Sequence, residues 1–496
     1  MKVLFVYPDI KKYGLYRGSF YSGIAYLSAA LKTGLKCEVS LLHATKPLAK
    51  IHFAEKLKSI KPDMVAFSST TNMFPYVRLW SKWVKESDKD ITVLCGGTHC
   101  TILPEEVIDV PNIDVVCIGE GEESIVELCD ELNRGLDITQ VKGLYTKNND
   151  KIYRNEMRPL IENLDTLPYP DRTIFDYPNL HTEREGCATV MVSRGCPFGC
   201  SYCCNTALRN IYKNPANYVR FRSVEKTISE LKNILGTYPS ITRFNFDDDI
   251  LPLRKEWFNG FTHNYKKEIG VPYECNIHPS LITEETVKLL KSSGCDRIRI
   301  GVESGNEHVR KQVLARNISN RRISEAFNLC QQNGIKTFSF NMVGLPDEEA
   351  GSMLDTVKLN ARIKSDRNQI TIFYPYPGTR LYEICESQNL INHNREVGDY
   401  TEDTILNFSK IKRNRIIFIQ RYFRVLVKCY QLIHKLPVHL LRLNEIILDK
   451  LIEARIMALF VFPFMNAAVD RTMKNKFLGT IVRKIYRRLL LSERKT

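Results

Sequence analysis

The sequence lacks a hydrophobic run long enough to cross a bilayer, and it lacks low-complexity tracts. The apolar run near its start is short and ends at Pro8 and Asp9, so we interpret it as a buried strand and not as a signal peptide. A second apolar stretch, residues 457–468, has twelve residues, too few for a transmembrane helix. With 44% hydrophobic and 26% charged residues, the composition excludes a disordered chain and predicts several folded domains.

Most of the chain also lacks any charge surplus. Residues 1–408 contain 51 Lys and Arg against 51 Asp and Glu, whereas residues 409–496 contain 20 against 5. The net charge of +15 therefore belongs to the C-terminal part alone. The chain has 15 Cys and no export signal, which argues against a disulfide framework and for thiols kept reduced in a cytosol.

Residues 1–142 show the pattern of a doubly wound α/β domain. Five short apolar runs, at residues 2–7, 38–42, 64–67, 92–94 and 115–118, are separated by helix-length segments, as in a parallel sheet covered on both faces. In such sheets ligands bind at the carboxyl ends of the strands. The residues at these ends are candidate ligand contacts: Tyr7, Pro8, Ser68, Ser69, Thr70, Gly96, Gly97, Thr98, Gly119, Glu120, Gly121 and Glu122. Their glycines and hydroxyls suit a large ligand, and the alternative is that they are only the turns that any such sheet needs.

The remaining chain divides into three parts. Residues 143–186 are polar and rich in Asn, Asp, Arg and Pro, which predicts a connector. Residues 187–385 alternate strand and helix signals in six units, too few for an eight-fold barrel, and so predict a partial barrel. Residues 386–496 predict a basic helical region, in which apolar residues recur at three- and four-residue spacing at Ile416, Ile419, Phe423, Leu426 and Tyr430.

The most specific motif is SRGCPFGCSYCCN, residues 193–205, which follows the first predicted barrel strand. Cys196, Cys200 and Cys203 place three soft thiolate ligands on one tight loop. Tetrahedral zinc would need a fourth ligand, such as Cys204 or a distant His. A 4Fe-4S cluster held by three thiolates keeps one iron open for a substrate or cofactor, and we favour it over zinc.

With Tyr202 before its last Cys, this loop resembles that of the radical S-adenosylmethionine (SAM) superfamily. The resemblance covers most of residues 187–385 and implies a catalytic 4Fe-4S cluster on Cys196, Cys200 and Cys203 that binds SAM. It also implies SAM contacts at the barrel strand ends: Tyr202, Asp247, Asp248, Asp249, Glu303, Ser304, Gly344 and Pro375. Strand alternation fits an inward Asp248 or an inward pair of Asp247 and Asp249 equally well. An Asx-rich turn without a binding role is the alternative at this segment.

The motifs GGTHCTILPEE, DVVCIGEGEES and LDTLPYPDR extend the resemblance, over residues 1–385, to the cobalamin-binding radical SAM enzymes. That group includes the class B methyltransferases and the magnesium-protoporphyrin cyclases. It implies a flavodoxin- or Rossmann-like cobalamin domain before a partial (β/α)6 barrel, with cobalamin held by the strand-end residues named above. The DxHxxG signature, which offers a His to the cobalt, is absent, but this group commonly binds cobalamin without it. We expect His43 and His99 to be turn or packing residues.

The resemblance implies that SAM is cleaved to a 5′-deoxyadenosyl radical and that, with cobalamin, an unactivated carbon or phosphorus is methylated. Oxidative cyclisation or rearrangement uses the same parts and stays an alternative. Methylthiolation of transfer RNA would need three ligand-spaced Cys in the front domain. Among the Cys of that domain, Cys37, Cys95 and Cys117 lie in or beside predicted strands, and Cys100 is a further candidate. A tethered scaffold with a non-catalytic barrel is disfavoured because the Cys loop is intact.

The basic C-terminal region allows three interpretations. The pairs Arg483-Lys484 and Arg487-Arg488 near the apolar stretch 457–468 favour peripheral attachment of a cytoplasmic protein to anionic lipid, which would suit a lipid-like substrate. A packed helical domain that helps to close the substrate pocket is a comparable alternative, and contact with nucleic acid is the least favoured. The other implied partners are a small-molecule substrate and an electron donor of the flavodoxin or ferredoxin type.

Overall fold

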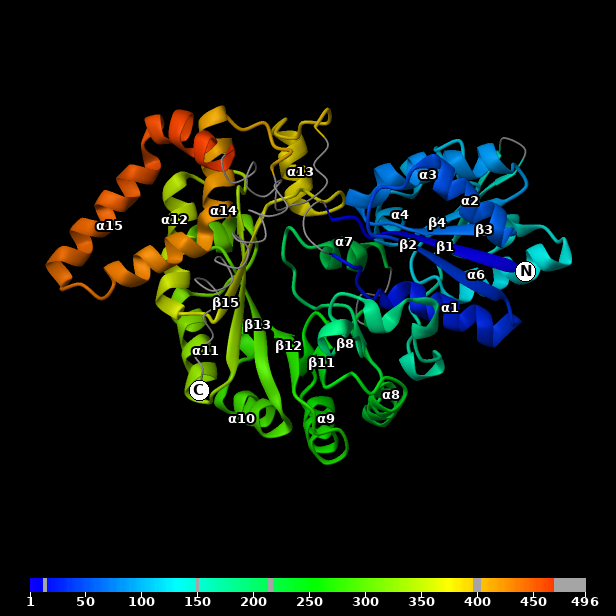
Figure 1. The fold of residues 1–496 in the computed structure, drawn as a ribbon, viewed down its shortest axis with the longest axis horizontal. Helices are drawn as coiled ribbons and strands as arrows, with labels where there is room; N and C mark the ends of the chain where they lie inside the picture. The colour runs from blue at the N-terminus through cyan, green and yellow to red at the C-terminus, as the bar shows by residue number, and fades with distance from the viewer. Residues whose placement is uncertain (12–15, 149–150, 213–216, 396–402, 468–496) are drawn as a thin grey trace.

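The front domain is a seven-stranded sheet with helices on both faces (Figure 1). The computed structural model describes residues 1–11, 16–148, 151–212, 217–395 and 403–467. The strand order is β2-β1-β3-β4-β5-β6-β7, and the first five strands in sequence are parallel. These five are β1 (Lys2–Pro8), β2 (Glu38–Ala44), β3 (Met64–Ser68), β4 (Thr92–Gly96) and β5 (Val115–Cys117). They coincide with the five predicted runs, which confirms the doubly wound fold.

The apolar run of β1 is continuous because both of its faces are covered. Val3 and Phe5 lie in the core with α1 (Ser22–Leu35) and α6 (Glu122–Arg134). Leu4 and Val6 point to the opposite face, as neighbours in a strand must, and pack with α2 (Lys50–Ile60) and α3 (Phe74–Ser87). All four side chains are almost completely buried. Two short helices, α4 (Thr98–Ile102) and α5 (Pro104–Ile108), follow β4.

The segment that we predicted as a connector begins with a hairpin. Strands β6 (Leu144–Asn148) and β7 (Lys151–Arg154) are antiparallel to each other, and β6 is antiparallel to β5. The sheet therefore has two strands more than the five that we expected. Strand β7 is an edge strand whose residues are all exposed or half-buried, so it carries no strong apolar signal.

Six parallel strands form the curled sheet of the second domain, as predicted for a partial barrel (Figure 1). In spatial order they are β15 (Arg367–Ile372), β14 (Lys336–Val343), β13 (Cys295–Glu303), β12 (Tyr273–Ile277), β11 (Arg243–Phe246) and β8 (Cys187–Val190). The helices that alternate with them are α8 (Val224–Thr237), α9 (Lys255–Glu268), α10 (Glu284–Ser293), α11 (Asn320–Gln332) and α12 (Ala350–Ile363). Helix α13 (Arg380–Ser387) follows the last strand.

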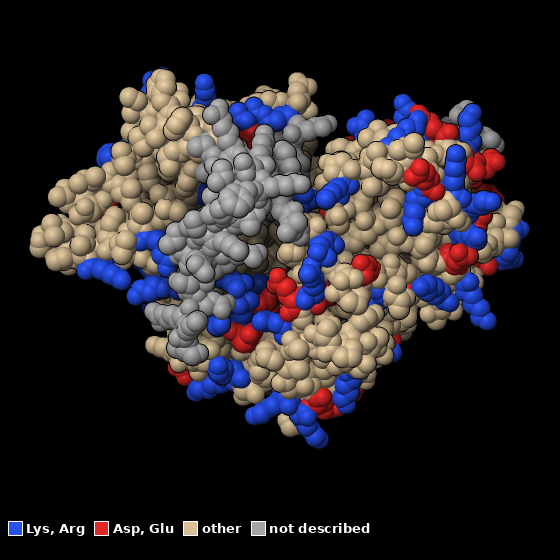
Figure 2. Space-filling model, in the orientation of Figure 1, with Lys and Arg blue, Asp and Glu red and all other residues tan. Residues whose placement is uncertain are grey.

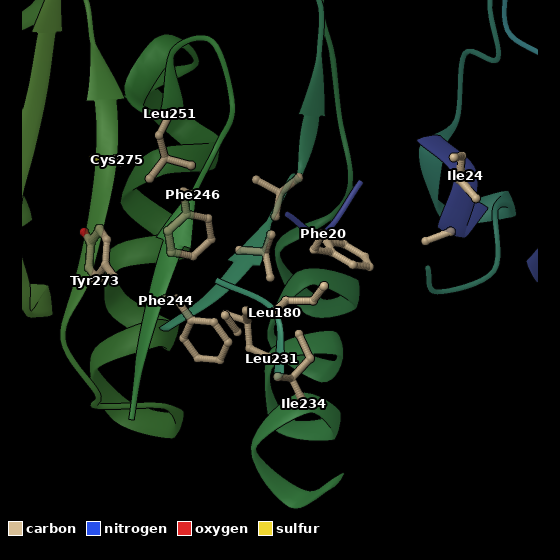
Figure 3. Close-up of a cluster of buried hydrophobic side chains, with 14 of the residues drawn as sticks. Phe20, Ile24, Leu180, Leu231, Ile234, Phe244, Phe246, Leu251, Tyr273 and Cys275 are labelled. Carbon is tan, nitrogen blue, oxygen red and sulfur yellow. The ribbon is translucent and has the colours of Figure 1, made fainter. Parts of the chain in front are cut away.

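One hydrophobic core joins the two domains (Figure 3). On the barrel side it contains Phe244 and Phe246 of β11, next to Leu231 of α8. Leu180 from the connector and Phe20 from the front domain belong to the same core. The connector is therefore a packed bridge, and the two sheets are held in a set orientation.

The described part of the C-terminal region is largely helical, as predicted, and it packs on the barrel. Helix α14 (Lys410–Ile433) lies against α12 and β15, and the five residues of the predicted apolar stripe are all buried: Ile416, Ile419, Phe423, Leu426 and Tyr430. Helix α15 (Val438–Glu453) and a π-helical turn (Met457–Val461) follow. In the described ranges, none of the helices has the length and hydrophobicity needed to cross a membrane. The basic pairs at residues 483–484 and 487–488 lie outside the described residues.

Candidate active site between the two domains

A cavity of about 410 Å³ lies between the carboxyl ends of the front-domain strands and the Cys loop of the barrel. Its front-domain wall includes eight of the predicted strand-end residues: Ser68, Gly96, Gly97, Thr98, Gly119, Glu120, Gly121 and Glu122. Its barrel wall includes Arg194, Gly195, Cys204, Asn205, Asp247 and Asp249. The tertiary structure thus brings eight predicted front-domain residues to one space with Asp247 and Asp249 of the barrel, whereas Cys196, Cys200 and Cys203 do not line it.

Four of the predicted front-domain residues do not line this cavity. They are Tyr7, Pro8, Ser69 and Thr70. The ring of Tyr7 stacks on Tyr21 at a centroid distance of 4.7 Å, and it is Tyr21 that lines the cavity. The hydroxyl of Ser69 is turned to its neighbour's backbone and donates to the carbonyl oxygen of Thr70 at 3.0 Å. We did not predict Tyr21, because it lies at the start of α1 and not directly after a strand.

Two glycines of the front wall stand where no other residue fits without strain. Gly97 has φ +103°, and a Cβ there would lie 2.6 Å from the carbonyl oxygen of Ser69. Gly119 has φ +77°, and its Cβ would lie 2.9 Å from Oη of Tyr212. Backbone with positive φ is readily adopted only by glycine. These turns therefore present bare backbone to the cavity, as a large, closely held ligand requires.

The Cys loop connects β9 (Ser193–Arg194) to α7 (Cys204–Ile211). Burial is the main cause that raises the pKa of Cys196 to about 12, and the nearby charges of Asp249, Cys203 and Cys200 raise it further. Within the described residues, no three metal-ligating side chains already converge as at a preformed metal site. The argument for a cluster therefore depends on the type and number of the ligands. Three half-buried or buried thiols on one loop are the ligand set of a 4Fe-4S centre with an open iron.

A small polar cluster supports the barrel side of the Cys loop. Arg316 Nη1 lies 3.8 Å from Sγ of Cys200 and opposes the rise that burial causes in the pKa of that thiol. Burial also raises the pKa of Glu303, while Arg316 and a hydrogen bond with Tyr202 lower it. Glu303 has φ +65° at the end of β13. Tyr202 and Glu303, both predicted SAM contacts, are thus close together beside Cys200, and Arg316 is a neighbour that the sequence did not point to.

The three acidic residues after β11 separate into two groups. Asp247 and Asp249 line the cavity, where Arg299 Nη2 lies 3.4 Å from Asp247 and Asn205 Nδ2 lies 3.0 Å from Asp249. Asp248 points away, and its Oδ1 accepts hydrogen bonds from the backbone N–H of Val192 at 2.9 Å and from both N–H and Oγ–H of Ser193 at 2.5 Å. Strand alternation allowed either Asp248 or the pair Asp247 and Asp249 to face the site, and in the structure it is the pair that faces the cavity. Their contact with SAM stays a prediction.

Three other predicted SAM contacts lie apart from this cavity. Ser304 is completely buried and its Oγ accepts from the N–H of Asn306 at 3.2 Å. Gly344 follows β14 and abuts Ile416 of α14, which would lie 3.1 Å from a Cβ at that position. Pro375 is buried after β15. The role of these three residues in binding SAM stays a prediction. The contact of Ile416 with Gly344 also shows that α14 reaches the strand ends of the barrel.

Four charged side chains tie the Cys loop to the front domain. Arg194, two residues before Cys196, binds Glu120 at 2.8 Å and also binds Glu122. Arg220 of β10 (Arg220–Phe221) binds Glu120 at 2.9 Å. Burial would raise the pKa of Glu120, but Arg194 and Arg220 together hold it below its usual value. The two predicted cobalamin contacts Glu120 and Glu122 are thus engaged in ion pairs across the domain boundary.

The front-domain His and Cys residues behave as packing residues. His43 Nε2 lies 3.0 Å from Asp9. Burial lowers the pKa of His99, whose ring packs against Phe74 at a centroid distance of 4.2 Å, to about 4. Neither His lines the cavity. Sγ of Cys95 and Cys100 lie 3.2 Å apart, whereas Cys37 pairs with Cys129. All five front-domain thiols are buried in the apolar cores of the domain, Cys37, Cys117 and Cys129 in one and Cys95 and Cys100 in the other, as expected of packing residues.

Exchanging Asp248 for Asn should remove a pH-dependent cost to stability. Burial raises the pKa of Asp248 to about 7, and the hydrogen bonds from Ser193 and Val192 oppose this only in part. The unfolded carboxyl titrates near about pH 4, so between about pH 4 and 7 the native state holds a proton that the unfolded state has released, and stability falls as the pH rises. Between about pH 5 and 8 the wild type should lose about 2–3 kcal/mol that Asp248→Asn does not lose.

Urea unfolding of both proteins over this pH range measures the difference. The exposed Asp88 provides the matched control, because Asp88→Asn should follow the wild-type profile. Parallel profiles for Asp248→Asn and the wild type would contradict the assignment of a neutral, buried carboxyl at Asp248.

Comparisons with known proteins agree with the site. Residues 190–359 match the family model of the Radical SAM superfamily, and residues 21–129 match that of the B12 binding domain. An uncharacterized methyltransferase of Pyrococcus horikoshii is 28% identical over 372 residues, covering 74% of this chain and 79% of its own. The anaerobic magnesium-protoporphyrin IX monomethyl ester cyclase of Rubrivivax gelatinosus is 25% identical, covering 77% and 70%.

The fold matches a solved structure as well. The radical SAM methyltransferase TsrM of Kitasatospora setae, with cobalamin and a [4Fe-4S] cluster bound, has a TM-score of 0.64 at 16% identity and covers 79% of each chain. The matched domains, the interdomain cavity and the three-Cys loop all agree with the resemblance seen in the sequence. The chain therefore contains a Radical SAM domain and a B12-binding domain, and it is homologous to cobalamin-dependent radical SAM methyltransferases.

Proposed function

We propose that this protein is a cobalamin-dependent radical SAM methyltransferase that methylates an unactivated carbon or phosphorus of a small molecule. The observation that carries the proposal is the cavity shared by the glycine turns of the B12-binding domain and the residues around the Cys loop. When bound, the 4Fe-4S cluster supplies the electron that cleaves SAM to a 5′-deoxyadenosyl radical, and cobalamin supplies a transferable methyl group.

The protein's own residues bind and orient these groups. The turns at Gly97 and Gly119 let a large ligand approach the backbone, and Tyr21 offers an aromatic ring beside them. Asp247 and Asp249 present carboxylates to the same space, which suits the ammonium group of SAM. Cys196, Cys200 and Cys203 would hold three irons of the cluster. The contact of SAM with Tyr202, Glu303, Ser304, Gly344 and Pro375 is part of this proposal.

Further partners follow from the same chemistry. Cleavage of SAM needs single electrons, so we propose an electron donor of the flavodoxin or ferredoxin type. The substrate is a small molecule, and a lipid-like one would suit peripheral attachment of a cytoplasmic enzyme to an anionic membrane surface through the C-terminal region. Nucleic acid is the least favoured partner, since α14 uses its apolar face to pack on the barrel and reaches the strand ends at Gly344.

Anaerobic reconstitution tests the proposal without knowledge of the substrate. We expect about four irons and about one cobalamin per chain, SAM-dependent formation of 5′-deoxyadenosine, and transfer of the methyl group of deuterated SAM to cobalamin. Cluster and SAM cleavage without bound corrinoid would contradict it. Bound cobalamin that never receives the labelled methyl would favour the cyclase or rearrangement alternative, with the Rubrivivax cyclase as the relevant relative.

A matched pair of variants locates the cobalamin. A Cβ at Gly96 would make only ordinary contacts, with Cβ of Cys117 at 3.5 Å and its carbonyl oxygen at 3.9 Å, so Gly96→Leu should fold and fill the cavity. Gly236, at the end of α8, has nothing within 4 Å of its Cβ, so Gly236→Leu is the control. We expect Gly96→Leu alone to lose cobalamin while both variants keep their iron. Equal amounts of bound cobalamin in the two variants would show that cobalamin binds outside this cavity.

A further inference from the structure

Helix α15 carries an apolar stripe that faces solvent. Leu440, Leu443, Ile447 and Leu451 are 40%, 54%, 55% and 49% exposed, although a helix on a globular domain normally buries such a stripe. Their spacing of three and four residues places them on one side of the helix. Figure 1 shows α15 at the outer edge of the molecule, on the side away from the front domain.

The charges of α15 are sorted between its two sides. Both acidic side chains of its middle part face the body of the protein, where Asp449 binds Lys358 and Tyr430. Glu445 also faces the body of the protein, where its Oε1 lies 2.8 Å from Nε2 of His434. The outward charges are mainly basic: Arg442 is exposed, and so is Lys450, whose Nζ lies 3.4 Å from Glu453 at the end of the helix. Over this end of the molecule the visible surface is mostly uncharged, with Lys and Arg along its lower edge (Figure 2).

An apolar stripe bordered by cations matches the surface of an anionic bilayer. Leucine and isoleucine side chains enter the boundary between headgroups and acyl chains, and Arg and Lys remain at the phosphates. A second copy of the chain fits less well, since two stripes packed face to face would bring Arg442 and Lys450 of each copy near those of the other. Exposed apolar residues continue beyond the helix at Ile456, Phe460 and Phe464.

We propose that α15 lies in the surface of an anionic membrane, with Leu443 and Ile447 inserted among the acyl chains and Arg442 and Lys450 at the headgroups. This inference rests on the peripheral attachment proposed above and names the element responsible. It does not depend on the reaction, because α15 contributes no residue to the cavity between the domains. SAM cleavage by the same samples therefore reports on the proposed chemistry separately.

Flotation of the full-length protein with vesicles of phosphatidylcholine, with and without phosphatidylglycerol, tests the inference. The double variant Leu443→Asp/Ile447→Asp should bind the anionic vesicles about tenfold or more weakly than the wild type. The matched control is Ile51→Asp/Leu79→Asp, which places the same charges at two exposed apolar positions of the front domain, 65% and 45% exposed. The control should bind like the wild type, and thermal unfolding and SAM cleavage should be unchanged in both variants.

A reporter separates insertion from simple attraction of charges. Tryptophan introduced by Ile447→Trp should be quenched by vesicles of brominated phosphatidylglycerol, whereas the three native Trp should not. Vesicle binding without this quenching, or equal binding by the double variant and the wild type, would overturn the inference. Sedimentation of the free proteins provides the last outcome: a dimer that the double variant dissociates would show that a second copy covers the stripe.

Discussion

Replacing Cys196, Cys200 and Cys203 together with Ala should lower the bound iron from about four atoms per chain to nearly zero and abolish cleavage of SAM. We propose these thiols as the ligands of three irons, and no other described side chains form a metal site that could take their place. The measurement is iron and sulfide analysis of anaerobically reconstituted protein, with 5′-deoxyadenosine as the product assayed.

Cys204 supplies a sharp control for this experiment. It follows Cys203 directly but lines the cavity, as the first residue of α7. Cys204→Ala should therefore keep its iron and its ability to cleave SAM, whereas a zinc site with four thiolates would lose its metal in both variants. Iron retained by the triple variant would contradict the cluster assignment. Because the loop is partly exposed, we expect little change in folding of the protein without its cluster.

Arg194→Ala should destabilise the protein by about 3–5 kcal/mol, because it removes the cation bound to the buried Glu122 and leaves Glu120 with Arg220 alone. The side chains of Arg194, Glu120 and Glu122 are only 19%, 13% and 7% exposed, so water compensates little of the loss. Arg194 also precedes the Cys loop, so the variant should loosen the contact between the two domains and weaken binding of cobalamin.

Urea unfolding measures the change in stability, and corrinoid content after gel filtration measures retention of cobalamin. Arg194→Lys keeps the positive charge and should restore part of both losses. The matched control is Arg134→Ala, which breaks an exposed pair with Asp130 and should cost less than about 1 kcal/mol. If Arg194→Ala lowered the free energy of unfolding no more than this control does, the ion pairs of Arg194 would not stabilise the contact between the domains.

The sequence by itself determined those features that depend on residues close together in the chain. Periodicity identified the five parallel strands of the front sheet, the six strands of the partial barrel and the buried stripe of α14, because burial on one or both faces imposes a local pattern. The spacing of Cys196, Cys200 and Cys203 pointed to a cluster loop for a similar reason, since the three proposed ligands lie within eight residues. The hairpin of β6 and β7 was missed because half-exposed edge strands carry only a weak pattern.

Only the tertiary structure decided which distant residues meet. Alternation along a strand allowed Asp248 or the pair Asp247 and Asp249 to face the site, and the choice was made by Val192 and Ser193, whose N–H groups hold Asp248 on the other side. Glu120 is 74 residues from Arg194, and nothing local to either residue marks the pair. The exposure of α15 is likewise a property of packing, because an apolar stripe looks the same in sequence whether a partner covers it or not. Contacts of this kind depend on how whole domains dock, and docking is set by a shared core built from residues throughout the chain.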